Sequence, residues 1–577
     1  MSSRPRLGLS LIVLLLIPLF CLASRYQQPT KTAKPIAYFV DQATKAGLTS
    51  RIVFGGVTTK KFIIETTGTG VAIFDYDNDG WPDIFIVNGT MLEGSPSSVA
   101  PTNHLYHNNH DGTFTDVTEK AGLAHSGWGQ GVCVGDYDND GYEDLYVTYY
   151  GKNVLYHNNG NGTFSDVSSK AGVAGNGKQW GTGCAFVDYD RDGKLDLMVA
   201  TYVRFDVATV PKPGEGIGCL WKGVPVMCGP RGLPSDSNIL YHNRGDGTFE
   251  DVTKKAHIDQ TNGHYGLSVS TLDFDDDGWP DIYVACDSTP SILYHNNHDG
   301  TFTDVAVLAG AAFNEDGMEQ AGMGSTVGDF DGDGRLDIFK TNFSDDTSTL
   351  YRNNGDGSFS DSTFPAGLGL HTQYLGWGTM FFDFDNDGWP DLLVVNGHVY
   401  PEVDQAHLGS DYQEPRILYH NKGNGTFEDL SAASGPGITT PSSSRGMAVG
   451  DLWNDGRLSA VVSNMNAIPS LLVNQVHYDS HWVAIQTEGV KSNRDGLGAR
   501  IRVKAGNRIL IDEVRSGSSY ISNSDRRVHF GLGSSNKIDW IEIRWPSGLQ
   551  EVFENPPVDK ILMLTEGQGK PVAVVAK

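Results

Sequence analysis

One nine-residue pattern, Asp-x-Asp-x-Asp-Gly-x-x-Asp, recurs along the chain and limits what it can fold into. Full copies begin at residues 75, 136, 188, 273, 329 and 383, and a seventh copy at 451 lacks the third and ninth carboxylates. Four carboxylates in nine residues repel one another, so a fold that keeps them together needs positive charge between them. Recurrence at this scale predicts a repeat architecture.

A second pattern follows each copy of the first. "LYHNNHDGTFTDV" begins at residue 105, and related segments begin at 155, 240, 293, 350 and 418. An Asp-Gly or Asn-Gly pair between two alternating runs predicts a β-hairpin. The seventh copy is only a first half, "LLVNQ" at 471, and its missing half, "YFVDQATKAGL", begins at Tyr38. A unit divided between the two ends of a repeat array closes a ring, whereas an open solenoid needs polar caps.

These patterns predict an all-β fold, a seven-bladed β-propeller over residues 36–476 in which an N-terminal strand closes the last blade. Gly fills 12 of the 14 positions that lie five and seven residues before the first Asp of each copy. Gly weakens a strand but is tolerated where backbones approach closely, as innermost strands do around an axis. Each Asp loop then joins the first and second strands of a blade. The three longest insertions, 88–103, 202–237 and 397–415, fall on the opposite face.

A second unit follows the repeats. Residues 477–566 contain short alternating runs separated by Gly, Ser and Asn, which predict a small β-sandwich-like domain. Residues 567–577 are predicted to be a flexible tail.

The Asp pattern indicates calcium binding in a β-hairpin. The side-chain oxygens at positions 1, 3 and 5 converge on one point, and Gly at position 6 permits the sharp turn that this needs. Position 7 offers a backbone carbonyl, and a carboxylate at position 9 completes a cage made only of oxygen atoms. Such a cage suits calcium better than magnesium. We expect about six sites, with no tight site at 451. The alternative, that Asp and Gly only form turns, does not explain why position 9 is kept six times. The predicted ligands are Asp75, Asp77, Asp79, Trp81, Asp83, Asp136, Asp138, Asp140, Tyr142, Asp144, Asp188, Asp190, Asp192, Lys194, Asp196, Asp273, Asp275, Asp277, Trp279, Asp281, Asp329, Asp331, Asp333, Arg335, Asp337, Asp383, Asp385, Asp387, Trp389 and Asp391.

The N-terminal segment and the net charge restrict location and partners. Arg4 and Arg6 precede an apolar run and then small residues, which is the layout of a signal peptide over residues 1–24, with a linker at 25–35. An uncleaved anchor is the alternative; with either, we expect an exported protein, periplasmic, cell-surface or secreted. No later segment is long and apolar enough to span a membrane. The net charge of −27 argues against nucleic acid as a partner.

The cysteines and the repeated histidines are interpreted as structural residues. Cys219 and Cys228 lie in a Gly/Pro-rich insertion and are predicted to form a disulfide, because export permits one and the loop has little core. Cys133, Cys184 and Cys286 lie in apolar strand-like runs and are expected to be buried thiols. The "LYHN" histidines, which are His107, His157, His242, His295 and His420, are interpreted as packing or hydrogen-bonding devices rather than metal ligands.

The repeats resemble FG-GAP/VCBS propeller repeats and are similar to the calcium-binding blades of integrin α-subunits. The C-terminal "NRDGLGARIRVKAG" and "IEIRWPSG" resemble the ASPIC/UnbV domain. The combination resembles the cartilage acidic protein family, in a bacterial-type secreted form without the dense cysteines of an added EGF-like module. The resemblance implies a secreted calcium-binding protein with no settled biochemical activity.

Two functions remain open. The first is a non-catalytic binding or adhesion module for a protein or glycan, in which the face opposite the Asp loops presents Tyr202, Arg204, Trp221, Tyr400 and Tyr412. The second is a carbohydrate-active enzyme that uses acids such as Glu402 and Asp404 on the same face. Arg526 and Arg527 with Trp540 and Trp545 could form a ligand patch, although packing within the sandwich is favoured.

Overall fold

The computed structural model describes residues 35–92, 100–260 and 263–572. The chain divides into two units, and the elements below all belong to the second, Ile36–Lys577. The predicted signal peptide lies outside the described residues, as does most of the predicted linker. Within the described residues, no helix has the length and apolar character needed to cross a membrane.

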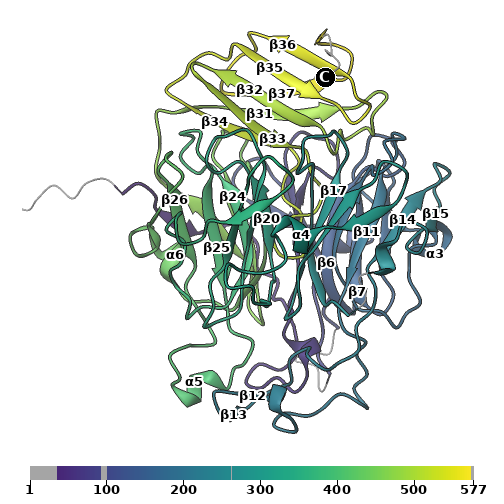
Figure 1. Ribbon diagram of the computed structural model, residues 1–577, viewed down its shortest axis with the longest axis vertical. Helices are drawn as coiled ribbons and strands as arrows, with labels where there is room; N and C mark the ends of the chain where they lie inside the picture. Colours follow the sequence, from purple (N-terminus) through teal and green to yellow (C-terminus); the bar gives the residue numbers. More distant parts are fainter. Residues whose placement is uncertain (1–34, 93–99, 261–262, 573–577) are drawn as a thin grey trace, which may run out of the picture. The chain divides into compact units, whose positions relative to one another are not determined.

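Seven antiparallel sheets of four strands, joined by loops and turns, are built from strands that lie between Phe39 and Asn474 (Figure 1). In each sheet the strand that precedes the Asp loop is innermost, and the loop joins it to the second strand. The innermost strands are β2 (Val71–Phe74), β6 (Trp128–Gly135), β10 (Gly181–Val187), β16 (Gly266–Leu272), β20 (Ser325–Gly328), β24 (Gly376–Phe382) and β28 (Ser444–Gly450). The second strands are β3 (Asp83–Ile86), β7 (Asp144–Tyr150), β11 (Asp196–Thr201), β17 (Asp281–Cys286), β21 (Asp337–Lys340), β25 (Asp391–Asn396) and β29 (Ser459–Asn464).

The "LYHN" pattern forms the third strand of each sheet and the segment after its Gly turn forms the fourth. The third strands are β4 (His104–Asn108), β8 (Val154–Asn158), β14 (Ile239–Asn243), β18 (Ile292–Asn296), β22 (Thr349–Asn353), β26 (Ile417–Asn421) and β30 (Ser470–Asn474). The fourth strands are β5 (Phe114–Asp116), β9 (Phe164–Asp166), β15 (Phe249–Asp251), β19 (Phe302–Asp304), β23 (Phe359–Asp361), β27 (Phe427–Asp429) and β1 (Phe39–Asp41). Strand β1 pairs with β30, with Phe39 opposite Asn474, so one sheet is completed from the other end of the repeat array.

The innermost strands pack against one another in ring order. Strand β2 contacts β6, each later inner strand contacts the next, and β28 contacts β2. Glycine makes this approach possible: a Cβ atom on Gly131 would lie 2.4 Å from the Thr182 carbonyl, and one on Gly446 would lie 2.5 Å from the Thr69 carbonyl. Apolar clusters fill the wedges between neighbouring sheets. The predicted all-β propeller fold is confirmed.

Short helices and loops join the sheets. One-turn helices follow several outer strands, and the others lie in insertions; they are α1 (Ala43–Ala46), α2 (Thr118–Ala121), α3 (Ser168–Ala171), α4 (Ala306–Ala309), α5 (Val403–Ala406), α6 (Pro436–Thr439), and the 3-10 turns η1 (Ile63–Glu65), η2 (Ile217–Cys219), η3 (Ile258–Gln260) and η4 (Ser431–Ala433). The insertion after β11 carries a hairpin of β12 (Leu220–Trp221) and β13 (Val224–Pro225). This hairpin and α5 lie at the end of the propeller away from the Asp loops (Figure 1).

The C-terminal part forms two further sheets, and the apolar residues between them are continuous with buried residues of the second and third blades. One sheet has the order β34-β31-β37 and the other β33-β32-β35-β36-β38. Strand β38 pairs with β36, so the start of the predicted flexible tail belongs to this sheet, which corrects the predicted boundary at residue 566. Their strands are β31 (His481–Glu488), β32 (Arg500–Ala505), β33 (Arg508–Glu513), β34 (Val528–Gly533), β35 (Trp540–Arg544), β36 (Gln550–Glu554), β37 (Lys560–Thr565) and β38 (Lys570–Pro571). Alternation places Ile501 and Val503 of β32 in the core, while Arg502 between them is exposed.

Residues 515–525, between β33 and β34, leave this domain and run among the innermost strands of the propeller. We call them the axial segment. Val132 of β6 donates its N–H to the Ile521 carbonyl (3.2 Å), and Ser325 of β20 donates to the Ser519 carbonyl (3.1 Å). The N–H of Asn523 donates to the Val71 carbonyl of β2 at 2.9 Å. Tyr520 is fully buried. The C-terminal domain therefore fills the propeller axis.

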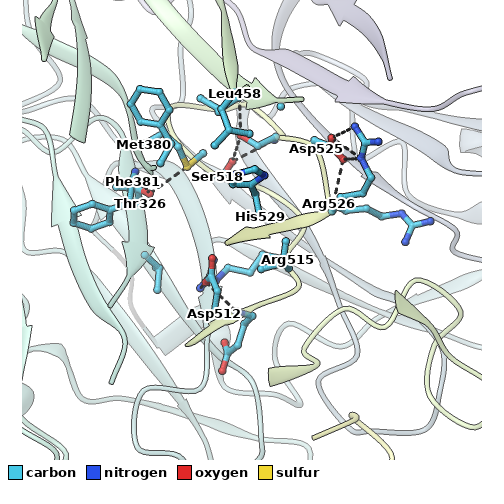
Figure 2. Close-up of a pocket in the computed structure, with 18 of the residues that line it drawn as sticks. Thr326, Met380, Phe381, Leu458, Asp512, Arg515, Ser518, Asp525, Arg526 and His529 are labelled. Carbon is cyan, nitrogen blue, oxygen red and sulfur yellow. Dashed lines mark hydrogen bonds and ion pairs between the residues drawn. The ribbon is translucent and has the colours of Figure 1, made fainter. Parts of the chain in front are cut away.

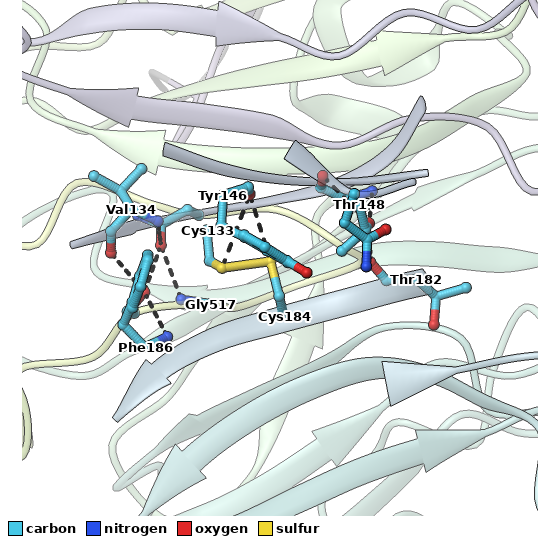
Figure 3. Close-up of a disulfide and its surroundings, with 12 residues drawn as sticks. Cys133, Val134, Tyr146, Thr148, Thr182, Cys184, Phe186 and Gly517 are labelled. Atoms are coloured by element: carbon cyan, nitrogen blue, oxygen red, sulfur yellow. Dashed lines mark hydrogen bonds between the residues drawn. A yellow bond between two sulfur atoms is a disulfide. The ribbon is translucent and has the colours of Figure 1, made fainter. Parts of the chain in front are cut away.

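Two disulfides are present. Cys219 and Cys228 are bonded within the insertion after β11, as the sequence predicts. Cys133 and Cys184 are also bonded, which corrects the expectation that they are thiols; Cys286 is a free buried thiol. Because β6 and β10 are neighbouring inner strands, the two Cα atoms lie only 5.7 Å apart. Figure 3 shows this bond beside Gly517 of the axial segment.

Candidate metal centres in the Asp loops

Each Asp loop is a tight turn with two residues in the left-handed region. In the first loop these are Asn78 (φ 57°) at position 4 and Gly80 (φ 87°) at position 6. Asn and Gly tolerate this conformation best, which explains why Gly occupies position 6 in every copy. The turn brings the carboxylates at positions 1, 3, 5 and 9 to one side of the hairpin.

Backbone N–H groups fix the first and ninth carboxylates. Asp75 accepts hydrogen bonds from the N–H groups of Asp79 (3.1 Å) and Gly80 (2.8 Å). Asp83 accepts from Tyr76 (3.2 Å) and from Asn108 (2.8 Å), the last residue of the "LYHN" strand. These bonds leave the remaining lone pairs of a preorganised acidic cage for a cation.

The "LYHN" histidine reaches the same cage. His107 Nδ1 lies 3.5 Å from Asp77 Oδ2 and 3.4 Å from Asp83 Oδ1. His157, His242, His295 and His420 repeat this contact with their own loops. Each is grouped with two of its loop's aspartates closely enough to share one metal ion. His295 and His420 hydrogen-bond to Asp281 (3.2 Å) and Asp391 (2.9 Å), whereas Nδ1 of the other three histidines has no hydrogen-bond partner among the described residues. The histidines therefore belong to the acidic clusters, which the interpretation as packing or hydrogen-bonding devices missed.

The "LYHN" asparagine connects neighbouring loops. Asn158 Nδ2 donates to the Tyr76 carbonyl of the preceding loop (2.8 Å) and to the Glu143 carbonyl of its own (3.1 Å). Position 4 adds a second link, because Asn78 donates to the Gly141 carbonyl at 2.7 Å. The Asp pattern and the "LYHN" pattern recur together in the blades, and this was the sequence signal from which their contact could have been predicted.

The electrostatics of the cage favour a bound cation. Burial raises the pKa of Asp83 to about 7 and that of Asp75 to about 6, since a carboxylate is less stable out of water and beside other carboxylates. Among the described residues, the buried oxygens Asp77 Oδ1, Asp188 Oδ1 and Asp190 Oδ1 have no hydrogen-bond donor. Unpaired buried acceptors fit a hard cation with oxygen ligands. In the first, second, third, fourth and sixth loops, two of the predicted aspartates lie together with the histidine, and the carbonyl ligands at position 7 stay a prediction.

The seventh loop keeps its shape without the ninth carboxylate. Asp451 accepts from Asp455 (3.1 Å) and Gly456 (2.8 Å), as its counterparts do. Ser459 stands at position 9, and Trp453 at position 3 packs against Phe114 with 5.8 Å between ring centroids. Apolar packing has replaced the acidic cage there.

The C-terminal domain covers the Asp loops. The N–H of Asp136, position 1 of the second loop, donates to Asp495 of this domain at 2.8 Å. Arg544 is paired with Asp273, and Arg508 donates to the Asp387 carbonyl at 3.0 Å while lying 3.9 Å from the centre of the Trp389 ring. Chemically, the arginines of this domain supply positive charge and donors around the acidic loops, and Asp495 supplies a carboxylate acceptor.

Arg526 and Arg527 lie at the contact between the C-terminal domain and the propeller, where both line a cavity, rather than within the packing of the sandwich. Arg526 is paired with Glu143 beside the second loop, and Arg527 donates to Asn454 of the seventh loop at 2.7 Å. Both arginines therefore anchor the C-terminal domain on the propeller, and Trp545 is buried separately in that domain.

A cavity of about 130 Å³ lies between the propeller and the C-terminal domain (Figure 2). Met380 and Phe381 line one side, and Arg515 and His529 line the other. Burial lowers the pKa of His529 to about 4, so its imidazole is neutral at pH 7. The cavity lies at the domain contact and adjoins two Asp loops, because Asp383 and Asp451, the first aspartates of the sixth and seventh loops, also line it.

The aromatic side chains predicted to face a partner are mostly internal. Tyr202, Tyr400 and Tyr412 are buried, whereas Arg204 is exposed and pairs with Asp236. Trp221 is half-buried, 6.2 Å from Tyr400 between ring centroids. The insertions pack against one another, because large rings at the mouth of the axis gain more from mutual burial than from exposure.

The predicted catalytic pair is also constrained. Burial raises the pKa of Glu402, and the Asp404 carboxylate accepts the Tyr412 N–H at 2.7 Å. Asp404 is thereby engaged in holding the 397–415 loop.

The comparisons with known proteins agree with the repeat patterns. Residues 75–147, 136–199, 232–284, 273–340 and 329–394 match the FG-GAP-like repeat, and residues 489–571 match the ASPIC and UnbV model. Mouse cartilage acidic protein 1 is 24% identical over 83% of this chain and 70% of that protein. The chain is a distant homologue of cartilage acidic protein 1. The human protein is 25% identical over 72% of this chain and 60% of its own length.

Two solved structures are similar to this chain at lower sequence identity than these relatives. The BP39L lectin of Burkholderia pseudomallei has a TM-score of 0.44 and 8% identity, covering 70% of this chain and 95% of that one. An Agrocybe aegerita lectin that recognises non-reducing terminal N-acetylglucosamine has a TM-score of 0.38 and 17% identity, covering 69% of this chain and 86% of that one.

Proposed function

We propose that this protein is an exported, calcium-stabilised binding module without catalytic activity. The observation that carries the calcium part is the set of buried aspartate oxygens with no donor among the described residues, inside loops whose other oxygens are already fixed by backbone N–H groups. Calcium, when bound, supplies the positive charge that lets these carboxylates stay ionised in the fold. The loop residues Asp75, Asp77, Asp79 and Asp83, with the Trp81 carbonyl, would hold it in the first blade.

The binding part rests on which surface remains accessible. The C-terminal domain contacts the Asp loops, so we propose that a protein or glycan binds to the insertions at the opposite end. Because Tyr202, Tyr400 and Tyr412 are buried, the contact would use exposed residues such as Arg204 and Leu220, which is 48% exposed. The Cys219–Cys228 disulfide would keep this insertion rigid, and disulfides are typical of exported proteins.

The test is a glycan array and a pull-down from the native envelope, each with calcium and with chelator, alongside a glycosidase panel. Calcium-dependent capture that Arg204→Glu weakens and Arg244→Glu does not would support the proposal. Turnover of a glycan that Glu402→Gln abolishes would instead establish the enzyme.

A further inference from the structure

The fifth blade differs from its neighbours at the residue that faces the cage. Five third strands carry histidine there, and β22 carries Arg352. Arg352 Nε lies 2.5 Å from Asp331 Oδ2, and its Nη2 lies 2.6 Å from Asp333 Oδ2. These aspartates are positions 3 and 5 of the fifth loop, and their side chains are only 13% and 18% exposed. One guanidinium therefore bridges two carboxylates that a metal would need.

The rest of the fifth loop has the same shape as the others. Asp329 accepts from Asp333 (3.1 Å) and Gly334 (3.0 Å), and Asp337 accepts from Phe330 (3.2 Å) and Asn353 (2.8 Å). The arginine thus changes the charge inside the cage without changing the hairpin.

A basic side chain at position 7 of a loop does not bridge two carboxylates as Arg352 does. In the third loop, Lys194 pairs with Asp192 at position 5 only, while His242 remains beside Asp190 and Asp196. In the fifth loop Arg335 likewise pairs with Asp333, and its Nε donates to the Asn353 carbonyl at 3.1 Å. Among the described loops with the full pattern, only the fifth has position 3 held by a guanidinium.

We infer that Arg352 is a built-in counter-ion that takes the place of calcium in the fifth loop. Guanidinium is charged at every pH the protein meets, and its planar donors match two carboxylates at once. A calcium ion brought between the same oxygens would be repelled by this fixed charge and would find two ligands already occupied. The inference rests on the proposed function and changes the expected number of sites from about six to about five.

The experiment counts bound calcium per chain by equilibrium dialysis with elemental analysis, using the full protein at saturating calcium. The wild type is expected to hold about five ions and Arg352→His about six, since histidine restores the arrangement of the other blades. Arg352→His combined with Arg335→Trp, which gives position 7 the tryptophan of the first loop, is also expected to hold about six ions. Arg244→His is the matched control, because exposed Arg244 pairs with Glu250 and touches no Asp loop that the structure describes. Its count should equal that of the wild type.

The reciprocal variant is His295→Arg in the fourth loop, which is expected to lose one ion. It keeps the inference testable if Arg352→His does not fold. Equal counts of about five in the wild type, in both Arg352 variants and in His295→Arg would overturn the inference and leave the proposed function standing. A wild-type count of about six calcium ions per chain would also overturn the inference and leave the proposed function standing. No bound calcium in any variant would overturn both.

Discussion

The carbonyl oxygen of Ile521 lies 1.9 Å from the point that a Cβ atom on Gly70 would occupy. Gly70 directly precedes the innermost strand β2, and Ile521 belongs to the axial segment of the C-terminal domain. Glycine at this position therefore admits the backbone of another domain into the ring, in addition to allowing neighbouring strands to approach. We therefore expect the propeller and the C-terminal domain to depend on each other for folding.

Replacing Gly70 by alanine should destabilise both domains together. The added methyl group must displace the axial segment or β2, an overpacking change that costs about 1–3 kcal/mol. Differential scanning calorimetry should show one transition at a lower temperature. Gly229→Ala, where nothing lies within 4 Å of the added Cβ, should melt like the wild type. Separate transitions for the two domains in the wild type would contradict this dependence.

The two disulfides should differ in their contribution to stability. Cys133–Cys184 spans 51 residues and joins two blades, whereas Cys219–Cys228 spans 9 residues within one loop. From loop-closure entropy, removing the first with paired alanines should cost about 4 kcal/mol and removing the second about 2.5 kcal/mol. Chemical unfolding of the two double variants measures the difference, and a larger loss from Cys219 and Cys228 would show that the ring gains nothing from its covalent link.

The asparagine of the "LYHN" strand should be a stability determinant in each blade. Asn158→Ala leaves the buried carbonyls of Tyr76 and Glu143 without a donor, which should cost about 1–3 kcal/mol. Ser165→Ala on the exposed neighbouring strand β9 is the control and should change little. Because Asn158 also holds the first Asp loop, its loss should weaken calcium binding at that loop. An unchanged calcium affinity would mean that Asn158 contributes to packing alone.

Lys60 should make stability rise with pH. Burial, together with the nearby Arg445, lowers its pKa to about 7, while Glu65 and Glu402 oppose the shift. An unfolded lysine keeps its proton to about pH 10.4, so between these values the unfolded chain binds more protons and the folded state gains up to about 1.4 kcal/mol per pH unit. Unfolding free energies at pH 7, 8 and 9 should rise more steeply for the wild type than for Lys60→Met. Parallel curves would mean that Lys60 stays charged in the fold.

Sequence patterns predicted the parts of the fold that repeat. The recurring Asp and "LYHN" patterns, with the unit divided between Tyr38 and residue 471, predicted the sheets and the pairing of β1 with β30. They predicted less about contacts between patterns, because hydrogen bonds such as Asn158 to Tyr76 join residues 82 positions apart. Two patterns that recur together in each blade are a reason to expect contact.

Features that occur once were harder to predict. The bond between Cys133 and Cys184 depends on the neighbouring placement of β6 and β10. The apolar strand-like sequence around each cysteine, taken alone, indicates a buried thiol. The burial of Tyr202 and Tyr400 depends on insertions that fold over one another. The axial segment, "RSGSSYISNSD", has the small polar composition of a surface loop, and only the glycines opposite it, such as Gly70, indicated a close neighbour.

The central claim is that calcium in the Asp loops stabilises the propeller, and the most direct measurement is the melting temperature with calcium and with chelator. Binding to the folded state alone contributes about 2.7 kcal/mol per site at a hundredfold excess over Kd, so the melting temperature should rise markedly with calcium and fall reversibly on chelation. Magnesium at the same concentration should raise it less, because magnesium dehydrates reluctantly and prefers a smaller octahedral site. The same melting temperature in calcium and in chelator would contradict the claim.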